Sequence, residues 1–480
     1  MSCARKQLRP TAVVLLTALC LALAWSVLPA RADATPSDLA PSELVTEEVT
    51  VPSDGAALDG TLVIPQDHAV DLPGLVMITG AGGMRQDYTA EAEELARSGI
   101  AVLLYDKRPT QRPAMSFDVL AADALAAVDL LSDHEATDPD RIGVWGHSEG
   151  AWVAPLAASE SDEVAFVVAV AGSAYSPDRS QLWSNRVHLT HAGVRESLLA
   201  PLGERLSRML VDLDAYGDVD HDPLATMGAV TQPILIVAAE HDRSVPAGES
   251  VGLLRDALAE HPHHTIRVVA DADHGMRHSE DGFDVDRSAP FAAGYPDLVT
   301  EWIHPLDPAE PVASVDEAPE QDTSTEPVAA LSWFETSGAH ATAVLLMLVC
   351  FASMPVTMLV RRIRRRPRDP SRWWLLSGSA AGIGVALGTP VYLFTIVMSG
   401  ASTVTTTVLG RPLPWLVLQL LASFLVVAAL VVATSRVRAA RANRAGSGST
   451  AVPITWGLSL PTLGAALFVP WATLWGLFTI

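Results

Sequence analysis

The stretch Arg-Ile-Gly-Val-Trp-Gly-His-Ser-Glu-Gly, residues 141–150, decides the fold of the first part of this chain. Its first five residues predict a buried strand, and residues 149–160 predict a helix. Glycines 146 and 150 flank Ser148 in a G-x-S-x-G motif, which requires glycine because strand and helix backbones approach where a Cβ would clash. The hydroxyl is then expected at a helix N-terminus, where the helix dipole favours developing negative charge.

Strand-like and helix-like segments alternate on both sides of this motif. The later strands are near-continuous apolar runs, such as Ile-Leu-Ile-Val-Ala at 234–238, which are typical of a parallel sheet covered on both faces. The first two strands alternate better and suit an antiparallel edge. The pattern predicts an α/β fold with a doubly wound, mostly parallel sheet. The predicted strands are 44–51, 57–64, 74–79, 100–105, 141–145, 164–170, 233–238 and 265–270, and the predicted helices are 88–98, 117–132, 149–160, 247–260 and 289–303.

A serine hydroxyl needs a base to become nucleophilic, and the base needs a partner that orients it. In this strand–turn–helix context the partners follow in the order Ser, then Asp or Glu, then His. Asp242 follows the strand predicted at 233–238, and His274 follows the next strand, at the sheet edge where α/β proteins collect functional residues. We therefore predict that Ser148, Asp242 and His274 form a catalytic triad.

Other polar residues compete for these roles. Asp271 and Asp273 flank His274, and Glu240 is an alternative to Asp242. Several histidines resemble metal ligands, but their spacing matches no zinc pattern, and a chain with three cysteines offers no cysteine metal site. We predict no metal and no cofactor, and we interpret these histidines as solvated: His241, His261, His263 and His264.

An oxyanion hole needs two backbone N–H groups. One is expected from Glu149, the residue after the nucleophile. The other is expected from the glycine-rich loop after the third strand, Thr-Gly-Ala-Gly-Gly at 79–83, whose glycines let the backbone face a substrate oxygen closely. We predict Ala81 as the second donor, with Gly82 as the neighbouring alternative.

These motifs resemble the α/β-hydrolase family, and within it the dienelactone-hydrolase-like and serine-aminopeptidase-like esterases. The resemblance covers residues 45–304 and includes Leu-Ala-Arg-Ser-Gly-Ile-Ala-Val-Leu-Leu-Tyr-Asp-Lys-Arg at 95–108. It implies that the insertion at about 174–230, whose leucines recur at helical spacing, forms a cap over the active site. The chain departs from the family at Thr79 and Ala81, where a His or Ser is usual beside the oxyanion glycines. It departs again at 109–113, where the family has a glycine-rich turn.

The two ends of the chain carry membrane signals. Basic residues, an apolar run from Ala12 to Leu28 and small residues at 29–34 predict a signal peptide over 1–32. Residues 337–480 hold one acidic residue, Asp369, and 12 arginines. Four apolar segments there reach the roughly 20 residues that cross a bilayer, and they predict a bundle of four transmembrane helices. These segments run over about 340–360, 373–399, 413–434 and 453–479.

Arginines set the expected orientation of these helices. They crowd the loops after the first and third segments, with Arg361 to Arg368 in one and Arg436 to Arg444 in the other. Arginine-rich loops stay cytoplasmic, so the hydrolase-like domain at 33–304 is expected outside the cell membrane of a multi-pass protein. An acidic, proline-rich stretch at 305–336 is interpreted as the linker between the two parts.

The resemblance implies cleavage of a small carboxylic ester through an acyl-enzyme. Two alternatives stay open: a serine peptidase or amidase acting on short peptides, and a non-catalytic sensor or scaffold domain. Membrane lipid is an expected partner of the apolar helices. Nucleic acid is not, since residues 33–336 hold 54 of the chain's 55 acidic residues and would repel phosphates.

Overall fold

The computed structural model describes eight stretches of the chain: 44–66, 71–108, 116–213, 218–284, 286–306, 312–365, 371–444 and 456–479. The predicted signal peptide over 1–32 and the loop at 109–113 lie outside these residues. The chain divides into two compact units. The first, called the hydrolase unit only after the family resemblance given above, comprises Pro36–Val187 and Leu213–Ala329. The second, the helical unit, comprises His188–Asp212 and Ala330–Ile480.

A nine-stranded sheet forms the centre of the hydrolase unit, in the order β1-β2-β4-β3-β5-β6-β7-β8-β9. The first two strands form the antiparallel edge that the alternating pattern predicts, and β2 pairs antiparallel with β4. All other neighbours are parallel. The strands are β1 Leu44–Ser53, β2 Ala56–Pro65, β3 Leu72–Ile78, β4 Ala101–Tyr105, β5 Thr137–His147, β6 Phe166–Val170, β7 Ile234–Ala239, β8 His264–Val269 and β9 Ala313–Val315.

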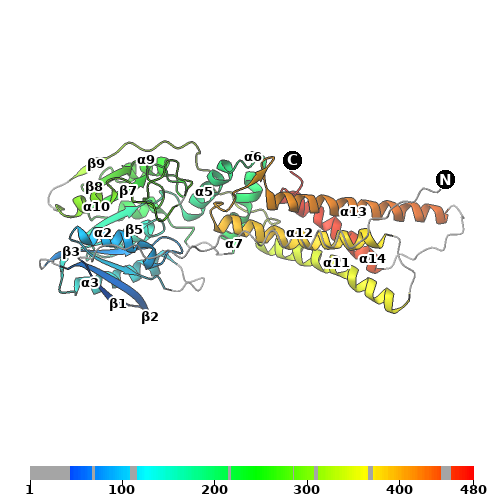
Figure 1. The fold of residues 1–480 in the computed structure, drawn as a ribbon, viewed down its shortest axis with the longest axis horizontal. Coiled ribbons are helices and arrows are strands. Elements are labelled where there is room, and N and C mark those ends of the chain that lie inside the picture. Colours follow the sequence, from blue (N-terminus) through cyan, green and yellow to red (C-terminus); the bar gives the residue numbers. More distant parts are fainter. Residues whose placement is uncertain are drawn as a thin grey trace. The chain divides into compact units, whose positions relative to one another are not determined.

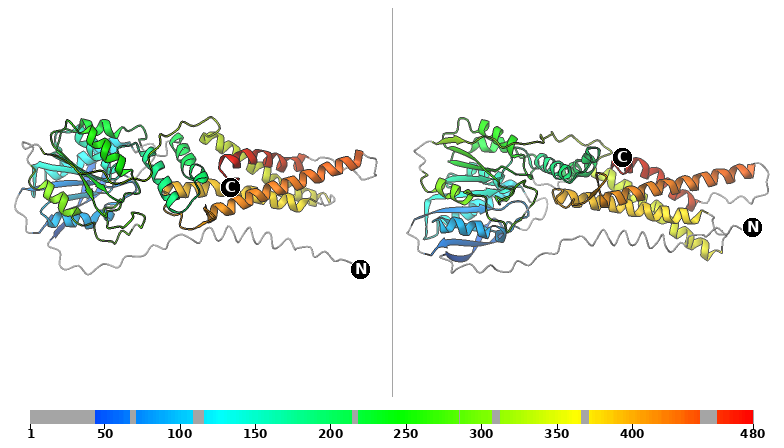
Figure 2. Two further views of the ribbon diagram at one scale, coloured as in Figure 1. Left: turned by 90° about the horizontal axis from the view of Figure 1, so that it is seen from above. Right: turned by 45° about the horizontal axis from the view of Figure 1, so that its top comes forward.

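Helices cover both faces of this sheet (Figures 1 and 2). Successive residues of one strand enter different cores: Leu75 and Met77 pack with the helices of one face, and Val76 and Ile78 with those of the other. That is the two-residue period of a strand buried on both sides. The first face carries α2 Thr89–Arg97 and α10 Tyr295–Ile303; the second carries α3 Phe117–Ser132, α4 Gly150–Glu160, α8 Pro223–Ala229 and α9 Ala247–Ala257.

Helix α10 starts six residues later than the pattern at 289–303 predicts. Gly294, the residue before it, has φ +80°, and Pro296 occupies the first turn. A left-handed residue cannot continue a right-handed helix, and proline is best accommodated at a helix start. The helix therefore begins at Tyr295.

Part of the predicted linker at 305–336 is ordered on the hydrolase unit. Residues 313–315 add β9 to the sheet beside β8. The following residues hold Glu249, on α9: Thr325 donates to its carboxylate from the backbone N at 3.0 Å and from Oγ1 at 2.6 Å. The Trp183 indole also donates to the Thr323 oxygen at 2.7 Å. An acidic, proline-rich sequence shows little tendency to fold alone. Here the open edge of β8 and the indole N–H of Trp183 provide hydrogen-bond partners for its backbone.

The insertion between β6 and β7 is helical, as predicted, but its central part belongs to the helical unit. Helix α5, Pro177–His191, is followed by α6 Glu196–Leu199, a π-helical turn η2 Ala200–Glu204 and α7 Arg205–Asp212. The part of the insertion in the helical unit makes hydrogen bonds to other segments of that unit. Arg195 N donates to the Gly410 oxygen at 3.0 Å, and Asp212 accepts from Ser337 N at 3.0 Å. The leucines at helical spacing in this segment are buried: Leu198, Leu199, Leu202, Leu206 and Leu210.

The remaining helices of this unit run alongside one another: α11 Ser337–Ile363, α12 Arg372–Met398, α13 Leu413–Arg444 and α14 Trp456–Leu474 (Figure 1). Three of them, α11, α12 and the part of α13 up to Arg438, are long and apolar enough to cross a membrane. The fourth is shorter: its apolar stretch Leu460–Leu474 spans about 22 Å at 1.5 Å per residue. Three of the four predicted transmembrane helices are therefore long and apolar enough to cross a membrane, and the described part of the fourth forms a shorter apolar helix.

Large apolar side chains lie exposed along α11, α12 and α13. They include six side chains that are 58–63% exposed: Leu345, Val349, Leu359, Val391, Leu420 and Leu430. Proteins in water rarely expose such continuous apolar surface, whereas a bilayer accommodates it. The burial pattern agrees with a membrane location for these helices.

A truncated chain tests the assignment of the insertion to the helical unit. Helices α11 and α12 contact α7, so a chain ending at Ala329 leaves part of the buried leucine face uncovered. We expect that chain to associate and to bind a hydrophobic dye, because uncovered apolar surface favours both. The same truncation with residues 192–212 replaced by a short Gly-Ser segment is expected to stay monomeric in size-exclusion chromatography. A monomeric, dye-free first variant would contradict the assignment.

Candidate active site

The turn between β5 and α4 is built by close backbone packing. A Cβ at Gly146 would lie 1.9 Å from the Gly150 oxygen, and one at Gly150 would lie 2.1 Å from the Ile78 oxygen. Between these glycines Ser148 takes φ +56°, in the left-handed region that non-glycine residues seldom occupy. Its backbone N is anchored to the Val170 oxygen at 2.9 Å. The strained turn presents the serine side chain at the carboxyl edge of the sheet.

The structure brings the three predicted triad residues together there. His274 Nε2 lies 3.0 Å from Ser148 Oγ, and His274 Nδ1 lies 2.8 Å from Asp242 Oδ2. These residues follow β5, β7 and β8, whose parallel register places their carboxyl ends side by side. Side chains that lie 32 and 126 residues apart along the chain thus form one continuous hydrogen-bonded series.

Asp242 is held so that one carboxylate oxygen faces the histidine. Its other oxygen, Oδ1, accepts from Ser244 N and Val245 N, both at 2.8 Å, and its side chain is fully buried. Burial disfavours the imidazolium of His274 and is the largest effect on this ring. The charge of Asp242, its hydrogen bond and the charge of Asp273 outweigh burial, and together they raise the pKa of His274 above the usual value. The histidine is therefore a stronger base than an isolated imidazole.

The glycine-rich loop after β3 lies against the serine. A Cβ at Gly80 would be 3.3 Å from Ser148 Cβ. The loop closes on itself, since Gly83 N donates to the Gly80 oxygen at 3.0 Å and Thr79 Oγ1 donates to the Gly83 oxygen at 3.1 Å. Within the part of the chain that the structure describes, the backbone N–H groups of Ala81 and Glu149 have no acceptor. These two N–H groups are therefore free to donate to a bound oxygen. Gly82, the alternative second donor, has φ +68°, in the left-handed region that favours glycine.

Tyr88 and His147 connect the glycine-rich loop to the backbone of His274 through hydrogen bonds. Gly80 N donates to the Tyr88 hydroxyl at 3.0 Å, which lies 2.8 Å from His147 Nδ1, and His147 Nε2 lies 2.7 Å from the His274 oxygen. Burial, and then the charge of His274, lower the pKa of His147 to about 3, so this ring is neutral. Since a carbonyl only accepts, Nε2 carries the proton and Nδ1 accepts from the tyrosine. Burial raises the pKa of Tyr88 to about 12, which keeps that hydroxyl protonated.

Lys107 binds backbone carbonyl groups of the same glycine-rich loop. It follows β4, and its ammonium donates to the Gly80 oxygen at 2.7 Å and the Thr79 oxygen at 3.1 Å. It also donates to the Glu149 carboxylate at 2.6 Å. Only 8% of the lysine side chain and 13% of the glutamate side chain are exposed, so water screens this ion pair weakly.

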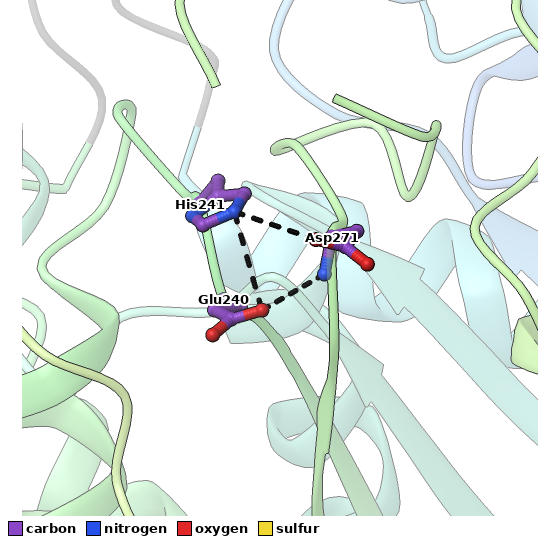
Figure 3. Close-up of side chains that lie close together, drawn as sticks. All are labelled: Glu240, His241 and Asp271. Atoms are coloured by element: carbon purple, nitrogen blue, oxygen red, sulfur yellow. Dashed lines mark hydrogen bonds and ion pairs between the residues drawn. The ribbon is translucent and has the colours of Figure 1, made fainter. Parts of the chain in front are cut away.

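The alternative partners for the histidine have other roles. Glu240 accepts from Asp271 N at 2.9 Å and lies near His241, whose Nε2 is 4.0 Å from Glu240 and 3.9 Å from Asp271 (Figure 3). Among the described residues, these three are the one group of side chains close enough to share a metal ion. Asp273 instead shapes the loop of the histidine, because its Oδ1 accepts from Gly275 N and Arg277 N, both at 2.9 Å.

Sequence reasoning assigned no role to Tyr88, His147 or Lys107. Lys107 had a usable signal, since it follows a buried strand at the carboxyl edge of the sheet, where functional side chains gather. His147 sits inside the G-x-S-x-G motif, but the motif leaves that position open. Tyr88 had no signal, because its contact with the loop depends on where the short helix η1, Arg85–Tyr88, lies in the folded chain.

Comparison with known sequences places this arrangement in a family context. The model of the prolyl oligopeptidase family, Peptidase_S9, matches residues 118–292. A mouse peroxisomal succinyl-coenzyme A thioesterase is 27% identical over 204 residues, which are 40% of this chain and 45% of that protein. An uncharacterized protein of Mycobacterium tuberculosis is 31% identical over 209 residues, 42% of this chain and 64% of that protein. The chain thus matches less than two thirds of each relative's length.

Solved structures also match part of this chain at low identity. A dienelactone hydrolase from Anabaena variabilis is 20% identical, with a TM-score of 0.35, over 54% of this chain and 97% of that one. A Pyrococcus furiosus esterase is 21% identical, with a TM-score of 0.37, over 54% of this chain and 89% of that one. The family model thus matches the part of the chain that runs from α3 to the loop after β8, within the mostly parallel sheet described above.

Proposed function

We propose that the chain is a membrane-anchored serine hydrolase that cleaves carboxylic esters through an acyl-enzyme. One observation carries the proposal: the hydrogen-bonded series from Ser148 Oγ through His274 to the buried Asp242 carboxylate, with distances of 3.0 and 2.8 Å. Such a series turns a weakly acidic hydroxyl into a nucleophile. The esterase and thioesterase activities named among its relatives point to the same chemistry.

The geometry supports a two-step acyl transfer. His274 Nε2 takes the Ser148 proton as Oγ attacks the ester carbonyl, and Asp242 stabilises the imidazolium that forms. The Ala81 and Glu149 N–H groups, which are free in the described structure, would hold the developing oxyanion. The imidazolium then protonates the leaving alcohol, and the same histidine activates the water that releases the acid.

An amide substrate is the second candidate, because the family model that matches residues 118–292 is that of prolyl oligopeptidases. Amine leaving groups need protonation more strongly than alcohols do, and the raised pKa of His274 favours a ring that carries a proton. Matched ester, thioester and anilide substrates with one acyl group therefore decide the preference. We expect the ester to be cleaved fastest.

We also propose that the hydrolase unit faces outward. The C-terminal ends of α11 and α13, which carry Arg361, Arg362, Arg436 and Arg438, lie at the same end of the bundle (Figure 1). The inserted segment His188–Asp212 binds the opposite end, at Ser337 and Gly410. Arginine-rich ends stay in the cytoplasm, so this insertion would lie on the outer side.

Replacing the nucleophile tests the proposed reaction. Ser148→Ala in the full chain, purified in detergent, is expected to lose ester hydrolysis by about four orders of magnitude or more. Fluorophosphonate labelling is expected to disappear as well, because the attacking oxygen is gone. The melting temperature should stay close to that of the unsubstituted chain, because serine and alanine are equally strained at a left-handed φ. Retained hydrolysis or labelling would overturn the assignment.

The raised pKa of His274 predicts the acid limb of the pH profile. A protonated ring cannot accept the serine proton, so kcat/KM falls as pH drops through this pKa, with a midpoint above the ordinary histidine value of about 6.5. Asp273→Asn removes a charge that raises the pKa but keeps an oxygen for Gly275 N and Arg277 N, so its midpoint should move to lower pH. If the acid limb of the unsubstituted chain has its midpoint below about 6.5, the carboxylates of Asp242 and Asp273 do not raise the pKa of His274 as described.

Cysteine accessibility tests the orientation. In a chain whose own cysteines are replaced by serine, Trp333→Cys is expected to react with a membrane-impermeant maleimide on intact cells, because Trp333 precedes α11 and is 82% exposed. Ile363→Cys, 72% exposed and flanked by arginines, is expected to react only after permeabilisation. The reverse pattern would place the hydrolase unit inside.

A further inference from the structure

We propose that Lys107 is a positioning residue that, with Glu149, holds the two halves of the oxyanion hole in register. The inference rests on the proposed function, because it concerns how that site stabilises its transition state. Lys107 touches no reacting atom. It contacts the Thr79–Gly83 loop and the Glu149 side chain, the two segments whose backbone N–H groups would bind the oxyanion.

The first half of the argument concerns the peptide between Gly80 and Ala81. In a planar trans peptide, the C=O of one residue and the N–H of the next point in opposite directions. The Gly80 oxygen accepts from Lys107 Nζ at 2.7 Å and from Gly83 N at 3.0 Å, so the carbonyl direction is fixed by two donors. The Ala81 N–H is then held pointing away from the lysine and is left free.

The preceding peptide is fixed at both ends. Its carbonyl, from Thr79, accepts from Lys107 at 3.1 Å, and its N–H, from Gly80, donates to the Tyr88 hydroxyl at 3.0 Å. A glycine-rich loop would otherwise sample many backbone angles, because glycine is the least restricted residue. Lysine on one side and tyrosine on the other remove that freedom before substrate binds.

The second half concerns Glu149, whose N–H is the other proposed donor. Glu149 occupies the first position after the nucleophile and precedes α4, and its carboxylate lies 2.6 Å from Lys107 Nζ. One ammonium group therefore joins the loop after β3 to the turn after β5. Both charges are largely buried, so the pair is strongly directional and each partner depends on the other.

Substitutions at both ends test this role in the full chain in detergent. We expect Lys107→Met to lower kcat for a p-nitrophenyl ester about 10- to 100-fold with little change in KM, because a displaced donor weakens the transition state more than the bound substrate. Affinity for a trifluoromethyl ketone, whose adduct carries an oxyanion, should fall by a similar factor. The endpoint of fluorophosphonate labelling gives the active fraction, so kcat is expressed per active site.

Two further variants separate positioning from folding. Lys107→Met alone leaves a buried carboxylate unpaired, whereas Lys107→Met combined with Glu149→Gln removes both charges and protects the fold. We expect the double variant to lose no more kcat than Lys107→Met, because the two residues act through one contact. Arg85→Met is the matched control: Arg85 pairs with Glu48 and Asp106 nearby, and its side chain has no bond to the loop carbonyls among the described contacts.

Each result decides between the two claims. A parent chain that neither hydrolyses esters nor reacts with fluorophosphonate overturns the proposed function, and this inference with it. An active parent whose Lys107→Met and double variants keep full kcat and full affinity for the ketone overturns the inference alone. Equal losses in Arg85→Met would also overturn it, since they would show a general effect of charge or stability at this edge.

Discussion

The Ile78 carbonyl oxygen occupies the space where a side chain at position 150 would have to begin, and the rest of the site depends on that contact. Strand β3, strand β5 and helix α4 meet there with backbone against backbone, which only glycine allows at 146 and 150. In the turn between them Ser148 takes φ +56°, in the left-handed region. Core packing thus supports the strained turn that holds the hydroxyl at the carboxyl edge of the sheet, beside His274.

The same edge of the sheet gathers the other side chains of the candidate site. Parallel strands end side by side, so the loops after β3, β4, β5, β7 and β8 reach one another although they are distant in sequence. Neutral and charged groups have separate tasks in this arrangement. The neutral His147 and Tyr88 orient backbone groups, whereas the Lys107–Glu149 pair and Asp242 provide fixed charges around the serine and histidine.

The chain passes between the two units at more than one point, because the insertion between β6 and β7 is shared between them. Its segment 188–212 leaves the hydrolase unit, packs within the helical unit and returns at Leu213. The resemblance to related enzymes implies a cap at this position, but here the leucine face is buried in the helical unit. The bundle therefore organises a segment that the hydrolase sequence itself contributes. Meanwhile the ordered strand β9 and Thr325 extend the hydrolase unit into the predicted linker.

The sequence by itself determined the features that follow from local periodicity and from covalent order. Apolar runs predicted the strands, and the glycine spacing predicted the turn around Ser148. The order of residues after successive strands predicted His274 and an acidic residue, Asp242 or Glu240, as partners of that serine. Tertiary structure decided what depends on directions in space. Sequence spacing does not encode which side chains face each other across separate loops. Only the folded chain shows that Asp242, not Glu240, contacts His274, and that Lys107 binds the Gly80 carbonyl. The same holds for the contact of Tyr88 with Gly80 N and for the unit to which the insertion belongs.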